Sequence, residues 1–492
     1  MLKGSLEKNL QKAKSLVKKQ EFEAAHQIYE EILCSFPKNP RVQVAAKKLE
    51  GLRGFKQGAN RQFESIDKIL DAYDRGDLIN ARVLSLRVLE AQPENVEAWN
   101  IFGAACKGLG RHEDATKAFE QVVKIDENNA RGFNNLGVAY HGRGLFQEAI
   151  EALQNATKLQ AGYAEAHFNL GNVFLDQEEW SRAIVSYENA INIKTDYSKA
   201  LNNLGSAFQH DGRFDQAVDA FEKALSINPN SAAAHNNKAL ALQDNGHYQD
   251  ALKSCQRAIA LDTNYSEAFK NLGNILVDLG RLDEAEVAYK KALFINPNFP
   301  EVTKALGLLK LRRHAFSEGF ELYESRWNTK RGNGVEPTFS KPRWFGKEKS
   351  TVFLWAEQGI GDEIMYASLM SEISGLCKEV TLECDHRLIP LFSKSLSEKI
   401  KYQPRNRPRQ VLDRDFQIPF GSLPSILRPD TESFANARQP YLYGNQEIAG
   451  RLRQQILGNK KAKIIGLSWH TDSNIQSSHH RNIKLSEIAQ TF

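Results

Sequence analysis

The 492-residue sequence has few cysteines and lacks any long hydrophobic run. Its five cysteines are odd in number and include no Cys-x-x-Cys pair, so they indicate thiols in a reducing compartment rather than a disulfide framework. No stretch of about 18 apolar residues is present, so no transmembrane helix is predicted. The charged residues 1–19 lack the apolar core of a secretory signal. We therefore predict a cytoplasmic protein.

The sequence also lacks the features of a nucleic-acid-binding or metal-binding protein. The formal net charge is only +5, and no basic helix or alternation of aromatic and basic residues dominates it. His470, His479 and His480 lie in a polar stretch without cysteine or helical spacing, so no metal site is predicted. The proportions of hydrophobic residues (41%) and charged residues (25%) are ordinary, and the length exceeds that of one compact domain.

The dominant feature of the sequence is a repeat with a period of 34 residues. One column of small residues comprises Gly103, Gly137, Gly171, Gly205, Ala239, Gly273 and Gly307. A second column comprises Ala115, Ala149, Ala183, Ala217, Ala251 and Ala285, and a column of mostly large residues comprises Phe119, Leu153, Tyr187, Phe221, Cys255 and Tyr289. The pattern predicts stacked helical hairpins, because small residues allow two helices to approach closely and large ones fill the gap to the next hairpin.

These columns resemble those of the tetratricopeptide repeat (TPR) family. Units are expected at 96–129, 130–163, 164–197, 198–231, 232–265, 266–299 and from residue 300 onward. Weaker repeats precede them at 6–39 and 62–95. We therefore assign residues 1–61 to a degenerate repeat with a helical connector, and residues 62–330 to an all-α TPR superhelix.

A further column of the repeat consists of asparagines, at Asn135, Asn169, Asn203, Asn237 and Asn271. In TPR proteins this offset faces the inner groove. An amide both donates and accepts, so a row of amides can bind the backbone of an extended peptide whatever its sequence. The row resembles the asparagine ladder of the O-linked N-acetylglucosaminyltransferases, which implies a protein or extended peptide as partner. Alternatively, each asparagine bonds within its own helix or is a tolerated exposed residue.

After a linker at 331–350, the pattern changes to that of an α/β module. An apolar strand at 351–356, a glycine turn, an amphipathic helix to about Leu376 and a strand at 379–383 predict a βαβ unit with parallel strands. Backbone N–H groups in such a turn can face an anion. Ile364 stands where a dinucleotide fingerprint has its third glycine, so NAD binding is not expected.

The same region carries the motifs Glu-x-Arg-Trp, Pro-x-Trp-x-Gly, Trp-Ala-Glu-Gln-Gly-Ile-Gly-Asp-Glu and, later, Ile-Ile-Gly-Leu-Ser-Trp-His. Together they resemble bacterial proteins that fuse TPRs to a glycosyltransferase module of GT-B type. The module is similar to the heptosyltransferases of glycosyltransferase family 9. The resemblance implies two Rossmann-like halves, a nucleotide-sugar as donor, a protein or saccharide acceptor, and no further cofactor.

The resemblance also implies site residues in the glycine turn. Asp362 is the candidate base for the acceptor hydroxyl, with Glu357 and Glu363 as lesser candidates. The part of the turn that would meet the acceptor or an anion comprises Gln358, Gly359 and Gly361. Arg481 is a candidate for the donor phosphate. The alternative for Asp362 is a capping role in the first turn of the helix, where the helix dipole stabilises a carboxylate.

Within the module, we expect a first Rossmann-like half at 351–443, a linking helix at 444–462 and the start of a second half at 463–492. A complete half needs on the order of 100 residues, so most of the donor half is absent. We therefore expect a multidomain TPR scaffold attached to an incomplete GT-B module that is related to glycosyltransferases and inactive in this chain. The alternative is a pure protein-interaction scaffold with a glycosyltransferase remnant.

Overall fold

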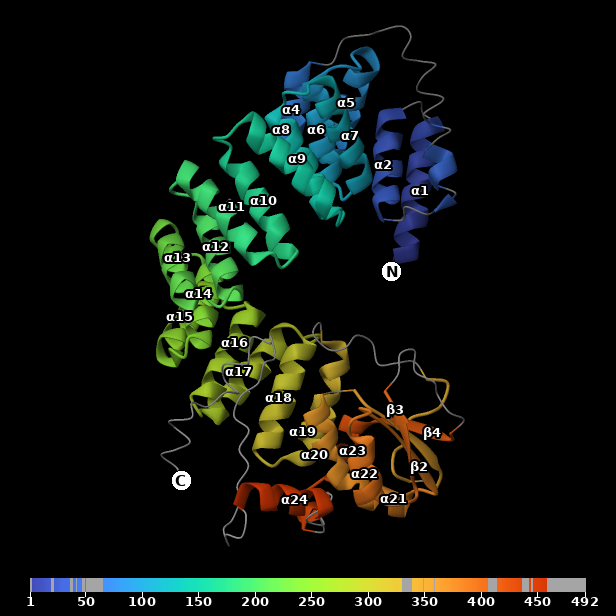
Figure 1. Cartoon of the computed structure of the whole chain (residues 1–492). Helices are drawn as coiled ribbons and strands as arrows, with labels where there is room; N and C mark the ends of the chain where they lie inside the picture. The colour runs from blue at the N-terminus through green and yellow to red at the C-terminus, as the bar shows by residue number, and fades with distance from the viewer. Residues whose placement is uncertain are drawn as a thin grey trace. The chain divides into compact units, whose positions relative to one another are not determined.

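The computed structural model describes residues 2–18, 22–35, 39–40, 42–46, 49, 65–329, 339–347, 349–357, 359–405, 414–435, 442–443 and 446–457. Within these residues the chain is mostly helical and carries one small parallel sheet (Figure 1). The chain packs as two compact units, Met1–Pro229 and Asn230–Phe492. In the described part, no helix is long and apolar enough to cross a membrane.

The first unit is built from helical hairpins. They pair α1 (Leu2–Lys18) with α2 (Phe22–Ser35), α4 (Ile66–Asp74) with α5 (Leu78–Ala91), α6 (Val96–Gly108) with α7 (His112–Ile125), α8 (Ala130–Gly142) with α9 (Phe146–Leu159), α10 (Ala164–Asp176) with α11 (Trp180–Ile193), and α12 (Ser198–His210) with α13 (Phe214–Ile227). From α5 to α12, the second helix of each pair also packs against the first helix of the next pair. The predicted helical repeats are therefore confirmed, and the units predicted to start at 130, 164 and 198 begin where α8, α10 and α12 begin.

From α4 to α19, the turn inside each hairpin uses one residue with a positive φ, again every 34 residues. Glycine occupies it at Gly76, Gly110, Gly144, Gly212, Gly246 and Gly280, with φ between 72° and 80°. Glycine suits the position because it has no Cβ to collide with the backbone in the left-handed region. Glu178 (φ 60°) and His314 (φ 62°) stand in the same column, so two turns hold a side chain in this unfavourable conformation.

The small column and the large column meet inside each hairpin. A Cβ placed on Gly103 would lie 2.7 Å from the Phe119 ring, and one on Gly205 would lie 2.7 Å from the Phe221 ring. The hairpin with an alanine in the small column is also the one with the smallest side chain in the large column: Ala239 and Cys255 are both fully buried. The two columns therefore encode one packing contact, in which the volumes of the two residues compensate.

The second unit begins with further hairpins and continues into the sheet. It pairs α14 (Ala232–Asp244) with α15 (Tyr248–Leu261), α16 (Ser266–Asp278) with α17 (Leu282–Ile295), and α18 (Pro300–Arg312) with α19 (Phe316–Tyr323). A 3₁₀ helix, η2 (Glu324–Asn328), follows α19 directly. The repeat period therefore extends to the edge of the α/β segment.

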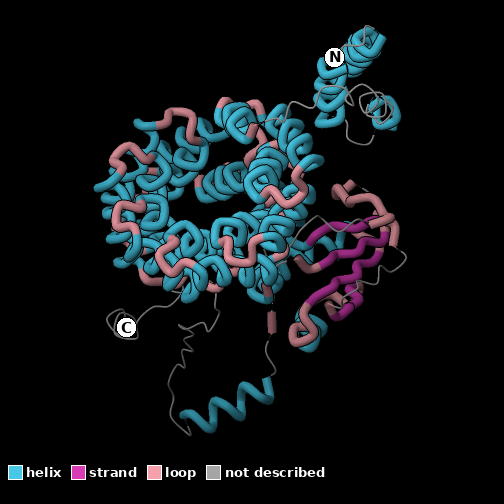
Figure 2. The backbone as a smooth tube through the Cα atoms, turned by 90° about the horizontal axis from the view of Figure 1, so that it is seen from above, coloured by secondary structure: helices cyan, strands magenta, loops and turns pink. Residues whose placement is uncertain are grey.

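The sheet has four parallel strands, drawn in magenta in Figure 2: β1 (Thr351–Trp355), β2 (Glu379–Cys384), β3 (Ile400–Pro404) and β4 (Phe416–Pro419). Their order is β3-β2-β1-β4. The connecting and following helices are α20 (Ile360–Tyr366), η3 (Ala367–Leu369), α21 (Met370–Leu376), α22 (Ile389–Ser395), η4 (Phe420–Ser422), α23 (Leu423–Leu427), η5 (Glu432–Phe434) and α24 (Gln446–Leu457). The residues that face one another across these layers form a single buried core that includes Trp344, Val352, Leu382 and Phe392.

The two predicted strands are present and parallel, as expected. The helix predicted to run to about Leu376 is instead interrupted, because η3 separates α20 from α21. The interruption buries Ala367, Leu369 and Met370 together in the sheet core. One straight helix would not place three residues at this spacing on the same face. The stretch 463–492, predicted to start a second half, lies outside the described residues, and the predicted domain boundaries stay predictions.

Candidate functional site

The predicted asparagine column lies on the first helix of successive hairpins. Asn135, Asn169 and Asn203 are on α8, α10 and α12 of the first unit, and all three are partly exposed. Asn237 on α14 is also partly exposed, whereas Asn271 on α16 is only 1% exposed. Neighbouring first helices contact each other within a unit, so the column forms a row across them.

Four of these amides, those of Asn135, Asn169, Asn203 and Asn271, donate a hydrogen bond to the preceding hairpin. The Asn135 Nδ2 donates to Asn100 Oδ1 at 3.3 Å, and the Asn169 Nδ2 donates to Asn134 Oδ1 at 2.9 Å. In both cases the acceptor stands 35 residues earlier, one place before the column in the previous repeat. We call such a bond between the first helices of adjacent hairpins a rung.

One rung of the first unit has a different acceptor, and the sequence explains why. The residue 35 places before Asn203 is Phe168, which has no side-chain acceptor. Asn203 Nδ2 donates instead to Asn172 Oδ1 at 2.9 Å, an atom that also accepts the hydroxyl of Tyr187 at 2.8 Å. The rung is thus kept by an asparagine one helical turn further along α10.

The second unit contains a rung that is closed to solvent. Asn271 Nδ2 donates to Asn236 Oδ1 at 2.8 Å, and both residues are buried. The Oδ1 of Asn271 is buried and accepts no hydrogen bond from the described residues. Asn271 therefore has the same inter-helix bond as Asn169 without an amide that a ligand could reach.

A second row of contacts joins the far ends of the same helices. His141 on α8 pairs with Asp176 on α10 (Nε2 to Oδ2, 2.8 Å), and Gln243 on α14 donates to Asp278 on α16 (2.5 Å). The partners are again 35 residues apart. The sequence analysis did not select these residues, although the repeated spacing of Asp176 and Asp278 from the small column was a usable signal.

The partly exposed amides retain hydrogen-bonding capacity beyond their rungs. Among the described residues, the carbonyl of Asn169 accepts no hydrogen bond, and one N–H of its amide is not used by the rung. A peptide backbone offers one donor and one acceptor per residue, so it matches such an amide. The alternative that each asparagine bonds only within its own helix does not describe Asn135, Asn169 or Asn203, because each of these side chains donates to the preceding hairpin.

The candidate carboxylate Glu357 follows β1 and is tied to an arginine. Arg326 donates from Nε to Glu357 Oε2 and from Nη2 to Glu357 Oε1, both at 2.9 Å, and the Gly421 N–H donates to Oε1 at 2.8 Å. Burial raises the pKa of Glu357, and the hydrogen bonds and charge of Arg326 oppose that rise. Glu357 is 7% exposed, so its carboxylate is held inside the protein.

The candidate Glu363 is also buried and paired. Its carboxylate accepts the Asp385 N–H at 2.8 Å and pairs with Arg405, so it links α20 to the ends of β2 and β3. Burial raises the pKa of Glu363, while the Asp385 N–H and the Arg405 charge act in the opposite direction. Both lesser candidates thus have structural partners, and their catalytic roles stay predictions.

The candidate base Asp362 lies in the first turn of α20 and is partly exposed. Its Oδ2 accepts the backbone N–H of Gly359 at 3.1 Å, so the side chain performs the capping role that was the alternative interpretation. Gly361 lies beside it in the same turn. Gln358 and Arg481 lie outside the described residues. The catalytic role of Asp362 stays a prediction.

Stacked hairpins with a polar row along their first helices define a helical-repeat protein. Family models for "Tetratricopeptide repeat" match residues 198–231, 220–253 and 266–299, and a model for "TPR repeat" matches 103–144, 143–178 and 171–212. The chain therefore carries an array of tetratricopeptide repeats.

Similar proteins include FlbA of Caulobacter vibrioides, which is 27% identical over 171 residues. That match covers 31% of this chain and 28% of FlbA, so the chain spans well under a third of this curated relative. A crystal structure of MamA is 33% identical and covers 34% of this chain and 91% of its own, with a TM-score of 0.31. The structure of YrrB, described as a TPR protein with an unusual peptide-binding site, is 20% identical and covers 39% of this chain and 98% of its own, with a TM-score of 0.34.

Proposed function

We propose that the chain is a protein-interaction scaffold whose first unit binds an extended peptide along α8, α10 and α12. The observation that carries this proposal is the row of partly exposed amides at Asn135, Asn169 and Asn203, each fixed by a rung to the previous hairpin. The rungs hold the amides in place before a ligand arrives, which lowers the entropy that binding costs. Recognition of main-chain groups predicts tolerance of sequence in the partner.

The size of the effect follows from hydrogen-bond energetics. One amide–backbone hydrogen bond contributes about 1 kcal/mol net, which corresponds to about a fivefold change in affinity. Removing the amides of Asn169 and Asn203 together should therefore weaken peptide binding by about 30-fold. Removing the Asn169 amide also leaves Asn134 Oδ1 without its donor, so the variant should lose about 1–3 kcal/mol of stability.

Asn271 supplies a matched control for that loss of stability. Asn169→Ala and Asn271→Ala each remove a rung of nearly equal length to a buried asparagine, 2.9 Å and 2.8 Å. Only Asn169 is accessible to a ligand. The affinity of both variants and of Asn169→Ala/Asn203→Ala is measured by fluorescence anisotropy, with labelled peptides that the unmodified chain selects from a randomised peptide array.

The proposal expects Asn169→Ala to lose affinity and Asn271→Ala to keep it, although both lose stability. Circular dichroism of each variant checks that the helices persist at the assay temperature. Equal affinities for the unmodified chain and the Asn169→Ala/Asn203→Ala variant would show that the amide row does not bind the peptide. Equal losses for Asn169→Ala and Asn271→Ala would assign the effect to stability alone.

We also propose, as a second candidate, that the α/β segment derives from a glycosyltransferase of GT-B type whose donor is a nucleotide-sugar. The observation that favours it is the parallel β1–α20–β2 connection with Gly359 and Gly361 at the end of β1. The acceptor would be a protein or a saccharide.

Sugar transfer is tested by incubating the full chain with radiolabelled nucleotide-sugars and measuring both hydrolysis and transfer. The scaffold proposal expects no turnover above the background of a heat-inactivated sample. Turnover that disappears in Asp362→Asn, with α20 still folded by hydrogen exchange, would establish the enzyme and give Asp362 its catalytic role. Asn is used because its carbonyl preserves a capping acceptor for the Gly359 N–H.

A further inference from the structure

The strand order of the sheet marks one position where ligands usually bind in parallel α/β folds. From β1 the chain moves to β2 and β3 on one side, and β4 then returns to the other side of β1. In open α/β sheets, ligands bind in the crevice beyond the carboxyl ends of the strands where the strand order reverses. Here that switch point lies between the ends of β1 and β4.

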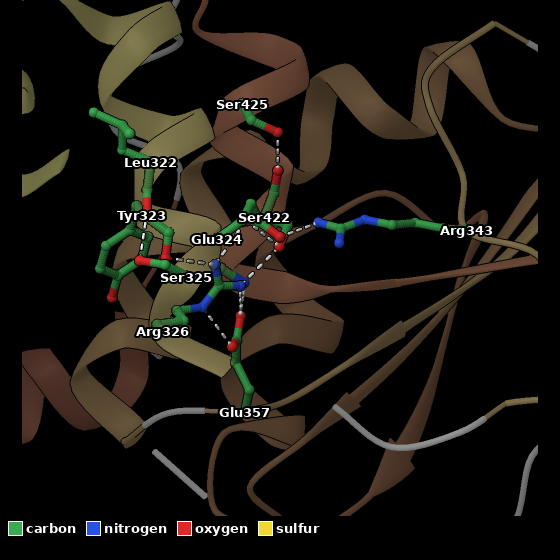
Figure 3. Close-up of polar contacts among 10 residues, drawn as sticks. Leu322, Tyr323, Glu324, Ser325, Arg326, Arg343, Glu357, Ser422 and Ser425 are labelled. Atoms are coloured by element: carbon green, nitrogen blue, oxygen red, sulfur yellow. Dashed lines mark hydrogen bonds and ion pairs between the residues drawn. The ribbon is translucent and has the colours of Figure 1, made fainter. Parts of the chain in front are cut away.

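The switch point is filled by a side chain from the helical repeats. Arg326 of η2 reaches it and bonds Glu357, the second residue after β1, through both carboxylate oxygens. The same guanidinium donates to Ser422 Oγ, three residues after β4, at 2.7 Å. Figure 3 shows Arg326 lying between Glu357 and Ser422. Arg326 is 6% exposed, so little of the guanidinium meets solvent.

The surrounding charges balance within the protein. Arg326 Nη1 also bonds Glu324 Oε1 at 2.6 Å, and Ser422 Oγ donates to the same oxygen at 2.8 Å. The other oxygen of Glu324 pairs with Arg343, in the segment that precedes β1. Two cations therefore meet two carboxylates. Burial alone would lower the pKa of Arg326, but Glu357 and Glu324 outweigh it and raise that pKa, so the guanidinium stays charged. We call Arg326, Glu357, Glu324, Ser422 and Arg343 the junction cluster.

Apolar contacts surround the junction cluster and join the same two parts. The rings of Trp327, after Arg326, and Trp355, at the end of β1, are 5.2 Å apart. Phe316 at the start of α19 lies 4.7 Å from Phe434, and α19 packs against α23. The last hairpin, the preceding hairpins of its unit and the whole α/β segment form one compact unit.

We propose that the α/β segment is the C-terminal cap of the repeat array, and that Arg326 closes its switch-point crevice as an internal ligand. A repeat array needs a cap because its last hairpin has no next hairpin to cover its apolar face. The segment supplies that cover, and the junction cluster fixes it in place. The crevice is thereby adapted to a planar guanidinium, which the chain itself provides, and it takes no separate substrate.

The proposal predicts that α19 and β1 open together when the guanidinium is removed. Removing one partner of a buried ion pair leaves the other charge uncompensated, so Arg326→Ala should speed hydrogen exchange in both elements by about 100-fold or more. Arg326→Lys, which keeps the charge but not the paired donors, should give a smaller increase in the same two elements. The control is Arg313→Ala, because Arg313 makes ion pairs with Asp283 and Glu286 in the same unit at a more exposed position.

The internal-ligand role is tested by chemical rescue. Methylguanidinium added to Arg326→Ala should restore protection of β1 and α19 by at least about tenfold, because it can donate to both oxygens of Glu357. Methylammonium at the same concentration and ionic strength should restore much less. If Arg326→Ala does not fold, Arg326→Lys serves as the parent for the exchange measurement, and methylguanidinium is added during refolding of Arg326→Ala to recover folded chain.

Three results would overturn the proposal. Exchange of α19 and β1 in Arg326→Ala at the unmodified rate would show that the cluster does not hold the cap. Fast exchange in β1 with an unchanged α19 would show that the two parts do not form one unit. Equal rescue by methylguanidinium and methylammonium, or none by either, would show that the crevice is not specific for a guanidinium.

Discussion

The compensation between Ala239 and Cys255 makes a sharp prediction about the repeat. In four other hairpins, glycine in the small column faces an aromatic ring, and a Cβ on Gly171 or Gly273 would lie 2.6 Å or 2.3 Å from the opposing tyrosine ring. Ala239 has that Cβ, so a ring at position 255 would meet it. We therefore expect Cys255→Phe to be destabilising and Ala239→Gly/Cys255→Phe to recover the stability that the single change loses.

The magnitude follows from packing. Overfilling a well-packed core costs about 1–3 kcal/mol, which is the expected loss for Cys255→Phe. Ala239→Gly alone should cost about 1 kcal/mol, because glycine is a poor helix former. In the double variant the clash is absent, and burial of the ring contributes about 2 kcal/mol. This contribution offsets the stability that the glycine substitution costs. The double variant should therefore lie within about 1 kcal/mol of the unmodified chain, with a coupling energy of about 1–3 kcal/mol.

The assay is hydrogen exchange measured by mass spectrometry, followed in peptides from α14 and α15. It reports the free energy of local opening, which suits a repeat array that does not unfold as a single two-state unit. Chemical denaturation of the unmodified chain, the two single variants and the double variant ranks their global stabilities. Additive losses in the double variant would refute the idea that the two columns encode one contact.

The remaining predictions concern backbone strain and acid stability. Glu178→Gly and His314→Gly should each stabilise the chain by about 0.5–1 kcal/mol in denaturant unfolding, because both positions have a positive φ. The control is a substitution by glycine at a neighbouring helical residue, which should destabilise the chain. Hydrogen bonds from Lys290 and Lys310 lower the pKa of Glu286 to about 2, so its stabilisation is present above pH 4.5 and is lost as the pH falls toward 2. The stability difference between the unmodified chain and Glu286→Gln should therefore shrink over that pH interval; a constant difference would contradict the ion-pair account.

The repeat part of the fold was predictable because its columns are physical contacts that recur at one spacing. Small and large residues in register specify the hairpin, and each glycine turn specifies the chain reversal. The turns at Glu178 and His314 lack the glycine that marks the other turns. Neighbouring hairpins impose on both residues a positive φ that they do not prefer. Only the period shows that they belong to the column.

The asparagine column was predictable, but its bonding was not. The sequence placed Asn169 and Asn271 in equivalent positions, whereas their exposure differs with the packing around each helix. The rung to Asn134 or Asn236 depends on the rotation of adjacent first helices, which is a tertiary property. The 35-residue separation of paired asparagines was the signal that could have revealed it.

In the α/β segment, alternation of apolar residues and turns predicted β1 and β2 but not the surroundings of Glu357. Its partner Arg326 comes from η2, beyond the predicted linker, and Ser422 comes from the end of β4. No local pattern links such positions, because the contact depends on how the last hairpin packs against the sheet. Asp362 was more accessible to sequence reasoning, since its bond to the Gly359 N–H is a local capping contact.

The central claim is that the partly exposed amides of α8, α10 and α12 bind an extended peptide. The most direct measurement is photo-cross-linking of the full chain with a selected peptide that carries a benzophenone group, followed by mass spectrometry of the linked fragments. The account predicts cross-links to these first helices near Asn135, Asn169 and Asn203, and their loss in the Asn169→Ala/Asn203→Ala variant. Cross-links confined to the second helices, or unchanged in that variant, would contradict it.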